Sequence, residues 1–176
     1  MTESRYLPQG SGMAINKSCQ CDRCIRCCKN NPGWFTPGEA IKAIRAGFAG
    51  KMMRDWLEPS EKVGNKERIW VLSPAASGFE GRDAPEMDFS SFFQVLSHTW
   101  KRGRCVMLQG RRCSIHASGF KPIECRITFG CSATAPKRSS HSSIAKLWRG
   151  PLGAKALRLW QERVRAERKA GKRGPR

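Results

Sequence analysis

Apolar residues recur at the spacing of an α-helix in one early stretch of the chain, and the residues around it carry helix boundary signals. The apolar positions, which fall on one face of such a helix, are Ala40, Ile41, Ile44 and Phe48. Thr36 and Glu39 stand where a capping box needs them, with a proline at the first helical position. The sequence therefore predicts a helix from residue 37 to about residue 48, closed by Gly47 or Gly50.

The apolar runs that follow are shorter and predict a mixture of elements. We predict a second short helix over residues 51 to 58, ended by Pro59. Its side chains available for packing are Met52, Met53, Trp56 and Leu57. The apolar run at residues 69 to 72 predicts a strand, and the glycines and prolines of residues 73 to 85 predict a loop. After Asp88, four apolar residues suit a helix or a buried strand almost equally.

Two elements are predicted around the later cysteines. Two short apolar runs flank a turn that contains Gly110, and the resulting hairpin would bring Cys105 and Cys113 close together. A short helix is expected to start at residues 120 to 122 and to run through Arg126.

The composition changes after the last cysteine. Ser, Thr, Pro and Lys dominate residues 133 to 143, which predicts a linker. Beyond it, apolar residues surrounded by arginines predict a basic amphipathic helix from about residue 151 to residue 170. Its apolar stripe consists of Ala156, Leu159, Trp160 and Val164. Because that stripe is narrow, we expect this tail to be separable from the rest of the protein and to need a partner surface or a polyanion for full order.

The number of cysteines indicates a chemical role in addition to packing. No apolar stretch is long enough to span a bilayer, and the first eighteen residues lack the apolar region of a secretory signal. We therefore expect a cytoplasmic protein. In that reducing compartment nine cysteines rarely persist as disulfides, and an odd number could not all pair within one chain. Thiolates bound to a metal are the better explanation.

The first cysteine cluster has the spacing C-x2-C-x2-C-C and consists of Cys21, Cys24, Cys27 and Cys28. Two-residue gaps let successive thiolates turn toward one ion or one iron-sulfur cluster. The adjacent pair Cys27 and Cys28 complicates a single tetrahedral site, because neighbouring side chains diverge along an extended segment. The pair would serve two metals, or one member would be a ligand and the other part of the core.

The second cluster is less regular and consists of Cys105, Cys113, Cys125 and Cys131. Both clusters together supply eight thiols, enough for two four-coordinate sites or for one multinuclear site. About 75 residues separate the clusters, so a shared metal would close a long loop and add stability that a small core lacks. Zinc would make the site structural, whereas iron would permit redox chemistry or iron delivery, and all-thiolate ligation suits both metals.

The cysteine pattern and its surroundings resemble the YkgJ-type cysteine-cluster family. The likeness covers about residue 21 to residue 131, roughly two thirds of the chain. Besides the first cluster, it is carried by Cys105, Cys113 with Ser-Ile-His116, Phe120-Lys-Pro122, Cys125 with Arg126, and Cys131. The resemblance implies a domain that chelates zinc or iron. A related cysteine-rich element occurs in flagellin lysine methylases.

Three residues beside the clusters have competing interpretations. Cys19 lies only two residues before Cys21, a gap that is unusual for one ion, so we interpret it as an accessory thiol. His116 could ligate the metal, and we favour a hydrogen bond to a metal-bound thiolate instead. Arg126 could offset thiolate charge or bind an acidic surface, although a solvated arginine is the default.

These patterns together predict an α+β fold. It would be a small metal-stabilised domain with short helices and a β-hairpin, followed by the basic C-terminal helix. We divide the chain into a flexible leader at residues 1 to 18, a cysteine-cluster domain at residues 19 to 135, and a linker with a basic helical tail at residues 136 to 176.

Charge gives a second functional hypothesis, of a different class. The net charge is +19, and residues 137 to 176 hold +11 of it, from thirteen Lys or Arg against Glu162 and Glu167. Such a tail would attract nucleic acid or another polyanion, with Trp148 and Trp160 available to stack on bases and the cysteine domain as a scaffold.

An enzyme is the least favoured hypothesis. Thiolates beside arginines do have lowered pKa values, but nothing in the sequence distinguishes one cysteine as a nucleophile or one histidine as its base. No phosphate-binding glycine loop and no dinucleotide fingerprint is present. A protein-modifying activity is indicated only by the methylase association.

Overall fold

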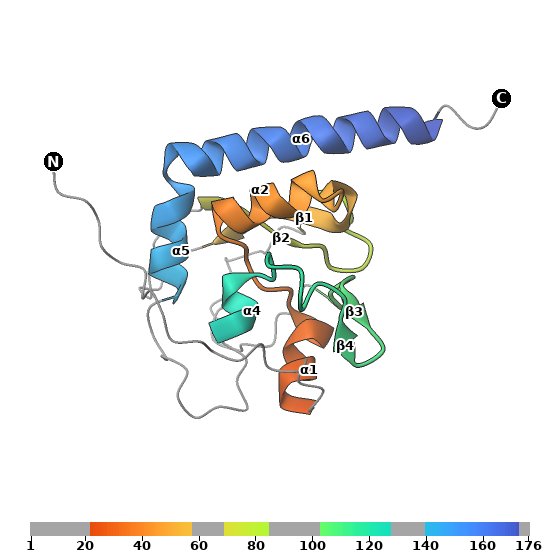
Figure 1. The fold of residues 1–176 in the computed structure, drawn as a ribbon, viewed down its shortest axis with the longest axis vertical. Helices are drawn as coiled ribbons and strands as arrows, with labels where there is room; N and C mark the ends of the chain where they lie inside the picture. The colour runs from red at the N-terminus through yellow and green to blue at the C-terminus, as the bar shows by residue number, and fades with distance from the viewer. Residues whose placement is uncertain (1–21, 58–68, 85–102, 128–139, 173–176) are drawn as a thin grey trace, which may run out of the picture.

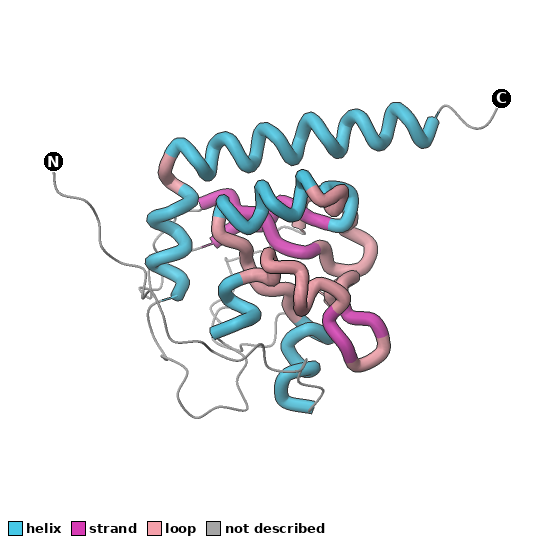
Figure 2. Tube along the Cα trace, viewed as in Figure 1, coloured by secondary structure: helices cyan, strands magenta, loops and turns pink. Residues whose placement is uncertain are grey.

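Helices and short antiparallel strands make up the computed structural model of this chain, which describes residues 22–57, 69–84, 103–127 and 140–172. This is the α+β class that the sequence predicts, and Figures 1 and 2 show the strands lying among the helices. The elements are α1 (Asp22–Asn30), α2 (Pro37–Arg45), a 3-10 turn (Ala49–Lys51), β1 (Met52–Leu57), β2 (Ile69–Pro74), β3 (Leu108–Gln109), β4 (Arg112–Cys113), α4 (Ile123–Ile127), α5 (Ser140–Trp148) and α6 (Pro151–Lys172). None of the helices described is both long and apolar enough to cross a membrane.

The capping box at the start of α2 is confirmed. Thr36 Oγ1 accepts from Glu39 N at 3.3 Å, and a Glu39 carboxylate oxygen accepts from Thr36 N at 2.8 Å. The helix ends at Arg45, slightly earlier than predicted, and the chain then turns at Gly47, whose φ of 84° suits a residue without a side chain. The apolar face of α2, with Ile41 and Ile44, is buried.

The predicted helix at residues 51 to 58 is wrong, because β1 occupies most of this stretch. β1 pairs with β2 in an antiparallel register that places Trp56 opposite Trp70. At its other edge, Arg54 exchanges backbone hydrogen bonds with residues 82 and 84. The strand is buried on both faces, so its sequence shows no alternation that would have distinguished it from a helix.

The other strand predictions hold with adjusted boundaries. The strand predicted at residues 69 to 72 is confirmed as β2, which also takes in the first two residues of the expected loop, and the remaining loop is described up to Ala84. The hairpin is confirmed with shorter strands: Gly110, at a φ of 57°, lies in the turn, and Cys113 is paired with Leu108. The short helix α4 begins directly after Pro122, as expected.

Three predictions fall on residues outside the described ranges. These are the leader at residues 1 to 18, the helix or strand after Asp88, and the first part of the linker, at residues 133 to 139.

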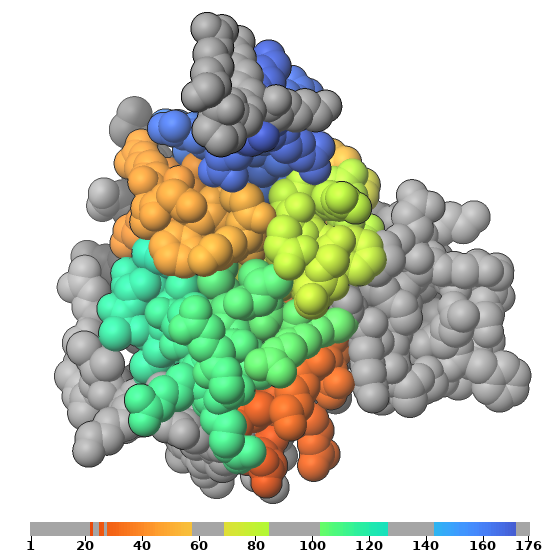
Figure 3. Space-filling view, turned by 90° about the vertical axis from the view of Figure 1, so that its right-hand side faces the viewer, coloured from red at the N-terminus to blue at the C-terminus, as the bar shows by residue number. Residues whose placement is uncertain are grey.

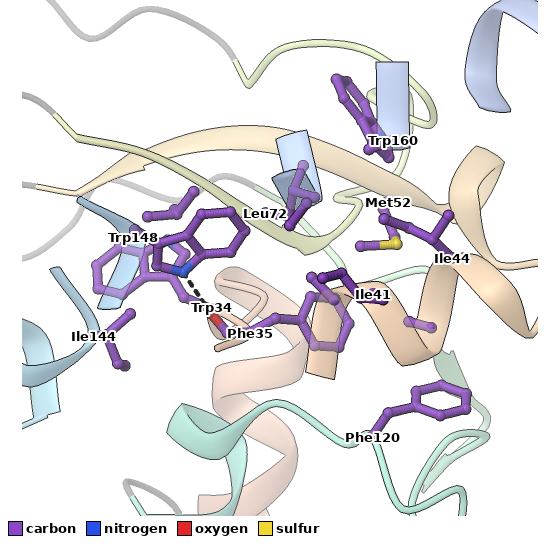
Figure 4. Close-up of a cluster of buried hydrophobic side chains, with 14 of the residues drawn as sticks. Trp34, Phe35, Ile41, Ile44, Met52, Leu72, Phe120, Ile144, Trp148 and Trp160 are labelled. Atoms are coloured by element: carbon purple, nitrogen blue, oxygen red, sulfur yellow. Dashed lines mark hydrogen bonds between the residues drawn. The ribbon is translucent and has the colours of Figure 1, made fainter. Parts of the chain in front are cut away.

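The C-terminal part packs on the core instead of standing apart from it. Residues 140 to 143, predicted as linker, belong to α5, and α6 lies along α2 and across the segment at residues 69–84 (Figures 1 and 3). Trp148 Nε1 donates to Phe35 O at 2.8 Å, and Trp160 Nε1 donates to Ala49 O at 3.1 Å (the first is drawn in Figure 4). The buried residues of the two helices are Ile144, Ala145, Trp148, Ala156, Trp160 and Val164. The predicted amphipathic helix is therefore present, and the surface that orders it is the protein's own core.

The corner between α5 and α6 requires a glycine. A Cβ atom built at Gly153 would lie 2.8 Å from the carbonyl carbon of Trp148 and closer still to its oxygen, and both are backbone atoms that cannot rotate away. The absence of a side chain at Gly153 thus lets α6 start close to the end of α5, where Trp148 enters the core.

We predict that Gly153→Ala lowers the free energy of unfolding by about 1–3 kcal/mol, the usual cost of forcing an extra methyl group into a packed site. Gly171→Ala is the matched control, because Gly171 lies in the same helix and has no atom within 4 Å of the added Cβ. That control should be neutral or stabilising by up to about 1 kcal/mol. Urea unfolding measures both, and equal effects would show that the corner is not constrained.

Candidate metal centre

The first cysteine cluster lies on a helix. The predicted divergence of Cys27 and Cys28 assumed an extended segment, whereas α1 spans both residues. Helical spacing places positions 24, 27 and 28 on one face of α1. The side chain described among these three is that of Cys28, which is half-buried.

The segment that carries Cys105 is bound to the end of α1 by its backbone. Cys105 N donates to Cys28 O at 2.7 Å, and Gly103 N donates to Asn30 O at 2.9 Å. The backbone of a second-cluster cysteine is therefore joined directly to that of a first-cluster cysteine. This contact spans the long sequence gap between the two clusters.

A surface ion pair joins the turn of the hairpin to the start of α1. Arg111 donates to Asp22 at 2.8 Å, and this hydrogen bond, together with the charge of the guanidinium, lowers the pKa of the Asp22 carboxyl. Both side chains are exposed, so the pair orients the hairpin more than it stabilises the fold.

Helix α4 brings Cys125 against the turn that follows α1. A Cβ atom at Gly33 would lie 2.6 Å from Cys125 Sγ and 3.2 Å from Cys125 N, so this close approach depends on glycine. Next to it, Trp34 N donates to the Glu124 carboxylate at 2.7 Å. The backbone around Gly33 is thus fitted to the helix that carries the thiol.

Glu39 fixes the same helix from the other side. Besides capping α2, its Oε2 accepts from Ile123 N at 3.1 Å, and its Oε1 pairs with Arg126. The carboxylate is buried, where a charge needs such partners. Arg126, predicted beside the cysteines as a possible counter-charge, therefore contributes by pairing with Glu39 and so positioning α4.

Four thiols from four separate segments converge as a result. They belong to Cys28 in α1, Cys105 before β3, Cys113 in β4 and Cys125 in α4. The Cys28 thiol interacts electrostatically with those of the other three, and Cys105 also interacts with Cys113 and Cys125. The predicted proximity of Cys105 and Cys113 is thus present, although the two are not paired across the hairpin.

Burial is the main influence on these thiols. It raises the pKa of Cys105 to about 12, and it raises the pKa of Cys28, Cys113 and Cys125. Neighbouring thiols raise the pKa of Cys28, Cys105 and Cys125 further, because adjacent negative charges repel. Without a cation among them, the four groups are neutral thiols at physiological pH.

Backbone N–H groups oppose this effect by pointing at the sulfurs. Hydrogen bonds from Met107 and Leu108 lower the pKa of Cys105, and one from Ile115 lowers the pKa of Cys113. Gly33 provides the corresponding bond to Cys125. Each of these bonds is stronger when the sulfur is a thiolate, so the backbone favours the charged form of the sulfur and partly offsets the effect of burial.

The remaining sequence-predicted ligands are not placed by the structure. Cys21 and Cys131 lie outside the described residues, as do the side chains of Cys24 and Cys27. Among the side chains that are described, no three Cys, His, Asp or Glu groups already stand as close as the ligands of one ion.

His116 lies beside the cluster and contacts a lysine. Its Nδ1 is 3.0 Å from Lys121 Nζ, and the charge of Lys121 lowers the pKa of Cys28 and of Cys113. Lys121 was not predicted as a site residue, although it lies between Phe120 and Pro122 of the motif. The positioning role of Glu124 was also missed, because its partner is 90 residues away in sequence.

Comparisons with models of protein families, with curated proteins and with solved structures found no match for this chain.

We predict that alkylation of Cys105 in metal-free, reduced protein keeps accelerating with pH. A pKa of about 12 instead of 9.0 lowers its thiolate fraction about 1000-fold at neutral pH. Between about pH 8 and pH 10 the iodoacetamide rate should rise close to tenfold per unit, whereas that of glutathione should begin to level off near its own pKa. Peptide mass spectrometry follows the site, and a Cys105 profile that levels off near pH 9 would contradict its buried environment.

We predict that Glu124→Ala destabilises the metal-free protein by about 1–3 kcal/mol, because it leaves the N–H of buried Trp34 without that acceptor. Glu80→Ala is the matched control, since Glu80 accepts one backbone N–H from Gly78 at an exposed turn. Chemical denaturation should show that the control loses less than about 0.5 kcal/mol of its free energy of unfolding. Equal losses would mean that Glu124 does not hold α4.

Proposed function

We propose that this protein binds zinc or iron through its cysteines, as the resemblance to the YkgJ-type family implies. One observation carries the proposal: Cys28, Cys105, Cys113 and Cys125 come from four segments, and their thiols lie near enough to one another to interact electrostatically in a region that buries them wholly or in part. The first and last of these thiols are 97 positions apart in sequence, and ligands contributed by distant segments are what a metal that closes a long loop requires.

The chemistry of the donors supports a soft or borderline cation. Three of the four sulfurs, those of Cys105, Cys113 and Cys125, receive peptide N–H groups from other residues, an arrangement that tunes thiolate ligands in metal sites. A bound cation would displace the thiol protons, and its charge would remove the repulsion that now raises their pKa values. Oxygen-preferring ions such as Mg²⁺ or Ca²⁺ do not match this donor set.

The remaining ligands would come from the first cluster and from Cys131. Positions 24 and 27 share a helix face with Cys28, and Cys21 precedes them by one helical turn. Eight cysteines would serve two four-coordinate sites or one multinuclear site. His116 and Arg126 would act indirectly, the first through Lys121 and the second through Glu39.

The biological role follows from which metal is bound. Zinc would hold α1, the hairpin and α4 together, because these short elements contribute few residues to the main core. Iron would add redox chemistry or iron transfer on the same scaffold. An enzymatic function is not part of the proposal.

The ligand prediction is tested by single substitutions with metal analysis of freshly purified, untagged protein. Cys28→Ser, Cys113→Ser and Cys125→Ser should each lower the bound metal well below the wild-type stoichiometry. Cys19→Ser is the control, and it should keep full metal content because it lies outside the motif. The assignment is wrong if Cys19→Ser loses as much metal as Cys125→Ser, or if the wild type holds none after anaerobic preparation.

The same preparation distinguishes the two metals. Broad visible absorbance that bleaches with dithionite indicates an iron-sulfur centre, whereas a colourless protein with stoichiometric zinc excludes one. Circular dichroism after verified metal removal then tests whether metal supports the fold. An unchanged helical signal and an unchanged thermal midpoint would mean that the metal does not support the fold.

A further inference from the structure

Arginines from three segments that are distant in sequence surround a hollow of about 280 Å³ beside α6. Arg54 from β1 and Arg82 from the turn after β2 line one side, and Arg165 and Arg168 from α6 line the other. Asp83 is the single acidic residue of this hollow, here called the first basic hollow. Its floor is formed in part by Trp160 and Val164, which are buried in the core.

Two of these four arginines, Arg54 and Arg168, bind other parts of the protein. Arg54 makes two hydrogen bonds to Asp83 and lies over the ring of Trp70 at 4.4 Å, and Arg168 donates to Gly81 O at 2.7 Å. The pair with Arg54 neutralises Asp83, the acid of the hollow. These contacts hold the walls in place.

The other two arginines are exposed and lack such partners. Within the part of the chain that the structure describes, neither Arg82 nor Arg165 has an ion pair or a hydrogen bond from its side chain. Holding two uncompensated guanidinium groups beside one hollow costs electrostatic free energy, which an anion would recover. The fork of N–H donors on arginine matches the oxygens of a phosphate group.

A second hollow of similar volume lies on the other flank of α6. It is lined by Arg45 of α2 and by Lys155, Arg158 and Arg163 of α6, against Glu162 as its acid, and is here called the second basic hollow. Exposed Arg158, Arg165 and Lys169 share the outer face of the helix between the two hollows, by their helical spacing. A single small anion would occupy one hollow, whereas this band suits phosphates repeated along a chain.

We propose that α6 and the turn at residues 78–84 form a composite binding site for the phosphate backbone of a nucleic acid. The site is separate from the candidate metal centre and differs from a flexible basic tail, because Arg54 and Arg82 come from β1 and the turn after β2, and α6 is packed on the core. Positive residues on both flanks of one rigid helix give backbone contacts without base recognition. Trp148 and Trp160, the two tryptophans that the sequence offers for stacking on bases, are buried in the core and therefore do not contribute to this site.

Deletion of residues 137 to 176 cannot test this site, because it would remove Trp148 and Trp160 from the core. Point substitutions on exposed side chains are therefore needed. Arg82→Gln with Arg165→Gln removes the two unpaired charges of the first basic hollow. The control is Arg26→Gln with Arg112→Gln, which removes the same charge from α1 and β4, at the opposite end of the molecule from α6 (Figure 1).

Fluorescence anisotropy with a labelled single-stranded RNA of about 20 nucleotides measures the dissociation constant between about 50 and 200 mM KCl. The hollow variant should bind at least about tenfold more weakly at the lowest salt, with its salt slope reduced by about 1.5. The control should stay within about twofold of the wild type. Metal content and thermal midpoint should match in all three proteins, which separates failure of this site from failure of the metal centre.

Competition identifies the anion. Unlabelled RNA should displace the probe at a far lower concentration of added negative charge than polyglutamate, inorganic phosphate or phosphatidylserine vesicles require. Equal losses in the two double variants would overturn the proposal, because binding would then follow net charge alone. Vesicles or polyglutamate competing better than RNA would overturn it as well, by assigning the hollow to a membrane or to an acidic protein.

Discussion

The backbone at residues 33 to 35 is the point on which the rest of the structure depends. Gly33 has no side chain, so Cys125 can approach it, and the next two residues bind elements on three sides. Trp34 N donates to Glu124, and Phe35 N donates to Leu72 O in β2 at 3.0 Å. The carbonyl of Phe35 accepts from Trp148. One short turn therefore joins the cysteine site, the sheet and the C-terminal helices, and none can shift without straining the others.

Two buried carboxylates hold the elements around that turn. Asp55 is fully buried in β1 and accepts from Trp34 Nε1 at 2.8 Å and from Trp56 N at 2.9 Å. Glu39 caps α2 and binds α4 at the same time. Isolated buried charges are costly, whereas several hydrogen bonds to one carboxylate make it a specific junction between segments. Both junctions are polar, so they fix orientation where the apolar contacts of a small core would permit sliding.

Features encoded within a few residues could be predicted from the sequence, and features that depend on distant partners could not. The capping box of Thr36 and Glu39 is a local signal, and so is the glycine turn at Gly110. In contrast, the second role of Glu39 needs partners 84 and 87 positions away. The strand β1 was mistaken for a helix for the same reason, because its conformation follows from its pairing with β2. Of the candidate site, the sequence predicts the cysteine ligands, which stay a prediction, and the residues that position the described cysteines, such as Glu124 and Gly33, carry no motif of their own.

The burial of Trp148 against Phe35 has a consequence for how the protein is made. The two residues are 113 positions apart, so at ordinary rates of translation Phe35 is synthesised about 6–23 s before the tryptophan that covers it. During that interval the face that α5 and α6 later occupy is bare, because both helices follow α1, the hairpin and α4 in the chain. The unfinished protein therefore exposes Phe35 and the apolar residues around it before their covering helices exist, and a chaperone would protect it at the stage when it is most prone to aggregate.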